Sequence, residues 1–346
     1  VVAGLLAREF GGTRRAQLIA AAGTATMPVL LAVDHLEGPT AFDILAWAAL
    51  ALFVARVGRT RQQRWWLPAG LVLGLGLTNK HSIGLFAAAL ALGLLITGDW
   101  RSIANRWFLL GAAVAAAFTV PDLLWQAGHG WATISMTRTL NQDNGGLGNV
   151  GSWIGGQFLM SAVAMLGVWI AGLRYLWRSQ RPTWRALVMA YGMLFALFMI
   201  TTGAQIYYLA GAYVYLLAAG AVSVEANLTR SGACRLAGAT AVSVAAAVAI
   251  VLPVLPPADI GWTYGINQVP GESLGWHQLV ATVDRAWLAL PPDQRAATVV
   301  FTADYGEAGA INELGRGRGL PAAVSGHNSE WWWGPGNPDA TTVLAV

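Results

Sequence analysis

Residues 66–97 read WLPAGLVLGLGLTNKHSIGLFAAALALGLLIT. Two apolar runs, 66–78 and 82–97, are separated in this stretch by Asn79, Lys80 and His81. Each run approaches the ~20 residues with which a helix crosses a bilayer, so the stretch predicts two membrane-spanning helices joined by a short polar turn. The same alternation of apolar runs and short polar connections continues along most of the chain and decides its fold class.

The composition supports a membrane protein. The 346 residues are 56% hydrophobic and 11% charged, with a mean hydropathy of +0.52, which excludes a water-soluble globule. Residues 1–7 are apolar with no signal peptide before them, so they read as the tail of a helix. We predict an all-α polytopic membrane protein with about ten transmembrane helices, the first truncated. The remaining apolar runs lie at 16–33, 42–55, 107–127, 153–173, 186–201, 208–224 and 236–254.

The arginines predict the orientation, because short cytoplasmic loops retain Lys and Arg. Fifteen arginines fall in connections that share one face, whereas the opposite connections hold only Lys80 and Arg138. The crowded face is therefore predicted to be cytoplasmic, and the net charge of +4 reflects topology and not nucleic-acid binding. The fifteen are Arg8, Arg14, Arg15, Arg56, Arg59, Arg61, Arg64, Arg101, Arg106, Arg174, Arg178, Arg181, Arg185, Arg230 and Arg235.

The composition changes after Pro257. Residues 258–346 predict a small extracytoplasmic α/β domain, with strands at 297–302 and 341–346 and a helix at 305–314. The domains are thus a transmembrane part, 1–257, truncated at its start, and an α/β part, 258–346, truncated at its end. The only cysteine, Cys234, excludes disulfides, and cysteine spacing predicts no metal site.

Lys80 is the only lysine among 21 basic residues. It lies on the face that topology depletes of positive charge, where a compact ammonium suits a phosphate. A lysine at a helix end also snorkels to the interface without a ligand, so both interpretations stay open.

The outer connections hold the other candidate residues, which are predicted to contact the substrate or its sugar. His35 and Asp43 belong to an acidic cluster that suits general-base or metal chemistry, or else a solvated loop with Asp43 at a helix start. Asp122 follows Pro121 at membrane depth, where an acid is a functional candidate or else the partner of an N–H or indole within the bundle, such as Trp125.

A long polar connection at 127–152 combines amides, carboxylates, glycines and tryptophan, as a sugar-binding surface would. A plain connecting loop uses the same turn residues. Its candidate contacts are His129, Trp131, Asn141, Asp143 and Asn144, with Arg138 as a second cation for a phosphate. Tyr207 and Tyr208 offer hydroxyls from the next outer connection, and the Trp-rich 325–334 stretch could bind glycan or pack on the membrane.

Four stretches together resemble the bacterial GT-C membrane glycosyltransferases related to protein O-mannosyltransferases and lipid A aminoarabinose transferases. The resemblance covers about residues 1–225. One departure is Gln205, where related sequences often carry a lysine before the tyrosines. The stretches are Leu6–Gly12, His35 with Thr40–Asp43, Gly74–Lys80, and Pro121–Gln126 continuing through His129–Trp131 to 144–148.

This resemblance implies transfer of a sugar from a polyprenyl-phosphate carrier to a lipid, glycan or protein acceptor, usually with inversion. Lys80 would hold the carrier phosphate. The catalytic base would be an acid in an outer loop before Val1, so this chain alone is expected to be inactive. The resemblance places the protein in the bacterial cytoplasmic membrane, with its active face outside.

A transporter or lipid flippase is the alternative function. Such proteins tend to show repeats and midplane polar residues, whereas the polar residues of this chain gather at one face. No cofactor and no nucleic acid is expected as a partner, and a divalent metal has no support in the sequence.

Overall fold

The structure is a computed structural model that describes residues 1–36, 38–143, 150–161, 163–201 and 205–346, and describes no side chains at 140–143. The chain forms two compact units, Val1–Leu252 and Pro253–Val346. The second unit begins a few residues before position 258, where the sequence predicts a new domain.

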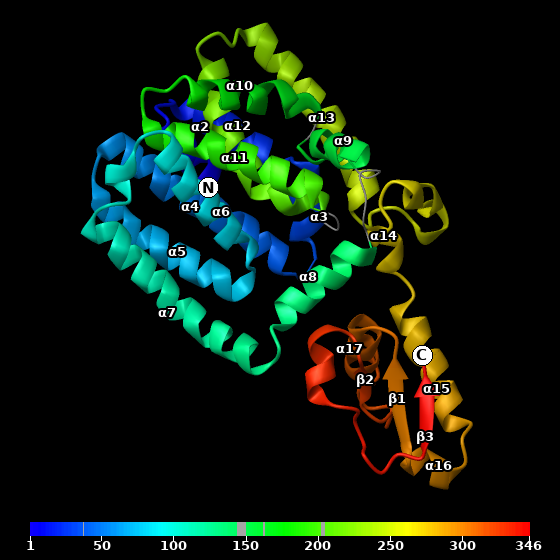
Figure 1. Cartoon of the computed structure of the whole chain (residues 1–346). Coiled ribbons are helices and arrows are strands. Elements are labelled where there is room, and N and C mark those ends of the chain that lie inside the picture. Colours follow the sequence, from blue (N-terminus) through cyan, green and yellow to red (C-terminus); the bar gives the residue numbers. More distant parts are fainter. Residues whose placement is uncertain (37, 144–149, 162, 202–204) are drawn as a thin grey trace. The chain divides into compact units, whose positions relative to one another are not determined.

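The first unit is built of helices, which Figure 1 shows from blue to yellow. Prolines begin α3, α4 and α11, where the missing N–H costs nothing, and Thr13, Asn105 and Thr229 cap α2, α7 and α13. The helices are α1 (Val2–Glu9), α2 (Arg14–Ala25), α3 (Pro28–Asp34), α4 (Pro39–Thr60), α5 (Trp66–Asn79), α6 (Ser82–Ile96), α7 (Arg106–Gly128), α8 (Ala132–Asp143), α9 (Val150–Met160), α10 (Leu166–Trp177), α11 (Pro182–Ile200), α12 (Ala210–Glu225) and α13 (Arg230–Val251).

Within the described ranges, five segments are long and apolar enough to cross a membrane: α4, α7, α11, α13 and Ile206–Glu225. Two bent helix pairs, α2 with α3 and α9 with Val163–Trp177, raise the number to seven if each pair is one span. α5 and α6 have only 14 and 15 residues. The predicted count of about ten spans is therefore not confirmed, because bends and short helices divide the apolar runs.

The polar connection predicted at 127–152 is largely helical in the structure. α7 runs on to Gly128, and α8 and α9 occupy Ala132–Asp143 and Val150–Met160. No Pro or Gly interrupts residues 132–143, so nothing in this polar sequence breaks a helix.

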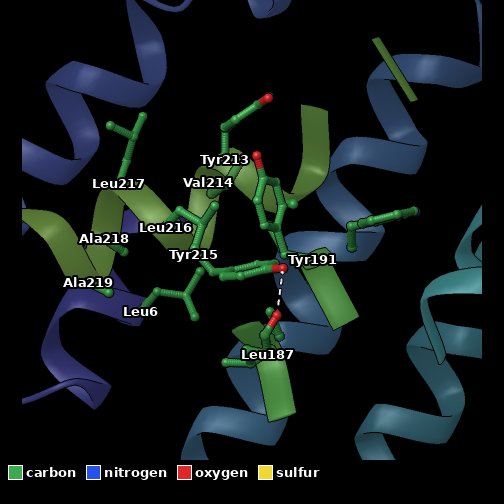
Figure 2. Close-up of a cluster of buried hydrophobic side chains, with 14 of the residues drawn as sticks. Leu6, Leu187, Tyr191, Tyr213, Val214, Tyr215, Leu216, Leu217, Ala218 and Ala219 are labelled. Atoms are coloured by element: carbon green, nitrogen blue, oxygen red, sulfur yellow. Dashed lines mark hydrogen bonds between the residues drawn. The ribbon is translucent and has the colours of Figure 1, made fainter. Parts of the chain in front are cut away.

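α12 forms the centre of the first unit. All its residues from Ala210 to Ala221 are buried, as expected of a helix that is apolar on every side. Its two buried tyrosines satisfy their hydroxyls inside the core. Tyr213 donates to Gln157 Oε1 at 2.8 Å. Tyr215 donates to the Leu187 carbonyl at 3.1 Å, the bond drawn as a dashed line in Figure 2. The core is thus apolar but leaves these two phenols hydrogen-bonded.

Two helix pairs touch through their backbones at glycines. A Cβ on Gly220 of α12 would lie 1.8 Å from the Val168 carbonyl oxygen of α10, and one on Gly70 of α5 would lie 2.0 Å from the Gly111 oxygen of α7. Small residues allow such close approach between membrane helices. These contacts fix the positions of α5 and α12.

A buried carboxylate joins α1 to α4 at the end that the arginines assign to the cytoplasm. Glu9 is 2% exposed and pairs with Arg56 at 2.8 Å and with Arg59. A carboxylate this deeply buried needs such partners. Two of the predicted cytoplasmic arginines therefore also hold the helix bundle together.

The second unit contains a three-stranded parallel sheet of order β2-β1-β3, from β1 (Thr298–Thr302), β2 (Ala323–Ser325) and β3 (Thr342–Ala345). Val300 of β1 pairs with Ala323 and Leu344. β1, β3 and α17 lie where the sequence predicts strands and a helix. The helices are α14 (Val269–Glu272), α15 (Trp276–Leu288), α16 (Pro292–Ala296) and α17 (Tyr305–Leu314).

Gly220→Ala should destabilise the first unit by about 1–3 kcal/mol, because the added methyl meets the backbone of α10. Thermal unfolding in detergent micelles would measure the loss. Gly238→Ala in α13 is the matched control, since no atom lies within 4 Å of its Cβ position. Equal melting temperatures for the two variants would contradict the close helix contact.

Candidate functional site

The turn between α5 and α6 presents Lys80. The Lys80 N–H still donates to the Gly76 carbonyl at 2.8 Å, and the backbone of Lys80 then becomes extended, with φ −156°. Asn79 Nδ2 donates to the Pro39 carbonyl at 2.8 Å. The turn is thus tied to the first residue of α4, which brings the ends of α5 and α4 together.

The Lys80 ammonium lies among side chains from two other segments. Its Nζ donates to Thr40 Oγ1 at 3.1 Å, and it lies 5.0 Å from the ring centroids of both Tyr207 and Tyr208. The two tyrosines belong to the short 3-10 helix Ile206–Leu209 before α12. Aromatic ring faces attract cations at this distance, so two rings and one hydroxyl hold the ammonium in place.

Asp43 lies beneath this cluster, within α4. Its side chain is buried, at 5% exposure, and Oδ2 accepts a hydrogen bond from Ser82 Oγ at 2.6 Å. Burial lowers the pKa of Lys80, and the Asp43 carboxylate opposes that shift. The ammonium is therefore partly desolvated, and among the described residues Asp43 is the carboxylate that balances its charge. This setting favours the approach of an anion.

A second polar pair lies beside the cluster. His81 Nε2 and Asp122 Oδ2 are 2.9 Å apart and join the α5–α6 turn to α7. The sequence predicts either a functional role for Asp122 or an N–H or indole partner within the bundle, and its partner in the structure is the His81 imidazole and not the Trp125 indole. Nothing in the sequence pairs these residues, because 41 positions separate them.

Two other predicted site residues bond carbonyls of their own segments, and a third is exposed. His35 bonds the Leu31 carbonyl of its own helix at 2.8 Å. His129 bonds the Trp125 carbonyl at 2.7 Å and stacks on the Trp125 ring at 4.2 Å. Trp131 is 45% exposed, with a left-handed φ of 57°.

Arg138 is exposed on α8. Asn144 lies outside the described residues, as do the side chains of Asn141 and Asp143, so their roles stay predictions.

Gln126 is a residue that the sequence did not single out. It is 6% exposed, and its Oε1 accepts from the Thr133 N–H at 3.1 Å while its Nε2 donates to Thr133 Oγ1. This side chain satisfies an N–H in the first turn of α8 and fixes the corner between α7 and α8. In the part of the chain that the structure describes, no three His, Cys, Asp or Glu side chains gather as a metal site.

Ser82→Ala should cost about 1–3 kcal/mol in unfolding free energy, because the buried Asp43 oxygen loses its hydroxyl donor. Thermal unfolding in detergent would report the change. Thr78→Ala is the control, since that exposed hydroxyl donates to the Leu75 carbonyl of its own helix. If both variants melted like the wild type, Ser82 would have no part in holding Asp43.

Comparisons with known proteins agree with this architecture. Residues 1–125 match the family described as dolichyl-phosphate-mannose-protein mannosyltransferase. The fold is similar to that of ArnT from Cupriavidus metallidurans, solved bound to undecaprenyl phosphate, with a TM-score of 0.57 and 15% sequence identity. The match covers 83% of this chain and 55% of ArnT, so the chain spans about half the length of that protein. No curated protein matches the chain.

The chain is thus a multi-pass membrane protein. The resemblance to the GT-C membrane glycosyltransferases is confirmed by the family match over residues 1–125 and by the shared fold.

Proposed function

We propose that this protein moves a sugar from a polyprenyl-phosphate carrier to an acceptor on the outer side of the cytoplasmic membrane. The observation that carries the proposal is the Lys80 ammonium, held between Thr40, Tyr207 and Tyr208 with no acid in salt-bridge contact among the described residues. The family match, the ArnT-like fold and the arginine-poor outer connections support it.

Lys80 would bind the carrier phosphate and stabilise it as the leaving group. An acceptor hydroxyl attacks the anomeric carbon, the bond from that carbon to the phosphate oxygen breaks, and the phosphate leaves with the electron pair. The acceptor proton passes to a base, which the family resemblance implies is an acid in an outer loop. The step therefore increases the negative charge on the phosphate, and an ammonium fixed beside it favours that change.

The position of Lys80 makes this interaction strong. Two unit charges 4 Å apart attract by about 1 kcal/mol in water and about 4 kcal/mol at the effective dielectric constant of ~20 found near protein surfaces. Because Lys80 is partly buried, its attraction to a phosphate is closer to the larger of these two energies. The Thr40 hydroxyl accepts a hydrogen bond from Lys80, and it can rotate to donate one to a phosphate oxygen.

Asp43 acts on the carrier through Lys80 in this mechanism. Because it is 5% exposed and bonded to Ser82, it is poorly placed for the sugar contact suggested from the sequence. Its negative charge instead favours the charged form of Lys80. Arg138, exposed on α8, stays a second candidate for the phosphate.

Lys80→Ala in the full-length protein should lower sugar transfer by about 100-fold or more, as loss of a charge-stabilising donor does in other enzymes. Transfer from a polyprenyl-phosphate sugar in proteoliposomes would measure it. Lys80→Arg should keep part of the activity, since it keeps the charge with a different shape.

Arg101→Ala is the control for charge loss, because Arg101 is exposed in a predicted cytoplasmic connection. Full activity of Lys80→Ala would remove Lys80 from the mechanism. A wild-type protein that carries lipid across the bilayer but transfers no sugar would favour the flippase alternative.

Tyr208→Leu should weaken binding of undecaprenyl phosphate roughly 2- to 30-fold, because a cation–π contact of about 0.5–2 kcal/mol no longer holds Lys80 in place. Tyr208→Phe keeps the ring and should bind nearly as the wild type does. Binding to protein in nanodiscs would distinguish the two. Equal losses in both variants would assign the effect to the hydroxyl and not to the ring.

A further inference from the structure

A cluster of tryptophans projects from the second unit. The 3-10 helix η8 (Asn328–Trp333) follows β2, and its last three residues are 66%, 46% and 78% exposed for Trp331, Trp332 and Trp333. Left-handed backbone brackets it, with φ 55° at Asn328 and 86° at Gly334. We refer to Trp331–Trp333 as the indole tip. Adjacent exposed side chains of this size indicate a surface that contacts something apolar.

The geometry of the indole tip argues against stacking on a sugar. A 3-10 helix has three residues per turn, so the side chains of three consecutive residues leave it about 120° apart. The indoles therefore radiate and cannot form one flat platform for a pyranose ring. Indoles that point in different directions suit insertion into the interface of a lipid bilayer, where apolar groups surround each ring and each N–H can reach water.

The few charged residues in the sequence around the indole tip indicate what kind of surface it contacts. Glu330 is the only Asp, Glu, Lys or Arg residue between positions 319 and 338, and no Lys or Arg occurs after Arg318. This stretch therefore offers no Lys or Arg of its own to a polyanion or an anionic lipid headgroup. An uncharged or zwitterionic surface fits this composition.

The second unit is joined by a short connection to a helix that can span a membrane. α13 has 22 residues, is apolar enough to span a membrane and ends at Val251. The second unit begins at Pro253, so no long linker separates it from the bilayer. Tryptophan is enriched at membrane interfaces because its ring is apolar and its N–H is polar.

We infer that the indole tip is a membrane-interface anchor that inserts into the headgroup region of a zwitterionic bilayer and holds the second unit against it. The anchor does not depend on the transferase reaction.

Site-directed spin labelling of the full chain tests this inference. Cys234→Ser removes the only native cysteine, and Trp333→Cys then carries a nitroxide in phosphatidylcholine nanodiscs. Power saturation compares collisions with oxygen, which concentrates in lipid, and with a water-soluble nickel chelate. The label at position 333 should favour oxygen several-fold over the label at the control position.

Asp293→Cys is the matched control in the same unit. Asp293 is exposed in α16, just before the amino end of β1, whereas η8 begins beyond the carboxyl end of β2. A label at 333 that is as accessible to the nickel chelate as the label at 293 would overturn the inference. If such an aqueous label were immobilised by added oligosaccharide, the indole tip would be a glycan site instead.

Discussion

Direct backbone contact between helices is the constraint on which the Lys80 cluster depends. Gly70 lets α5 lie against α7, and Gly220 lets α12 lie against α10, at distances that exclude any Cβ. α5 ends at Asn79, directly before Lys80, and α12 begins just after Tyr207 and Tyr208. Since helices move largely as rigid rods, fixing the middle of each helix also fixes the ends that carry these three side chains.

Placing the Lys80 ammonium in a partly apolar setting costs free energy, and the groups around it offset that cost. Thr40 accepts a hydrogen bond from Lys80, and two phenol rings present their electron-rich faces to it. The buried Asp43 carboxylate supplies a counter-charge. None of these partners neutralises it by direct ion pairing within the described residues. Glu9 shows the opposite arrangement, because two arginines form ion pairs with that buried carboxylate.

Several features could be predicted from sequence because each depends on local composition. The apolar runs predict a membrane protein, and the single lysine indicates a candidate site at the turn after α5. Tyr207 and Tyr208 were predicted as contacts on the same face, but not as neighbours of Lys80. The roles of Thr40, Ser82, His81 and Gln126 were missed, since a hydroxyl, imidazole or amide in one sequence carries no sign of a distant partner. The sequence predicts a connecting loop at residues 132–143, which are helical in the structure, because a polar exposed helix has the same composition as a polar loop.

The sequence by itself therefore determined that this is a membrane protein with an isolated lysine between two apolar helices, because hydropathy and charge sum along the chain. Only the tertiary structure decided which groups meet that lysine. Thr40 lies 40 positions before Lys80, and the two tyrosines lie beyond six further helices, α6 to α11. Such contacts depend on how closely helices pack, and that closeness is set by where glycines on one helix face the backbone of another.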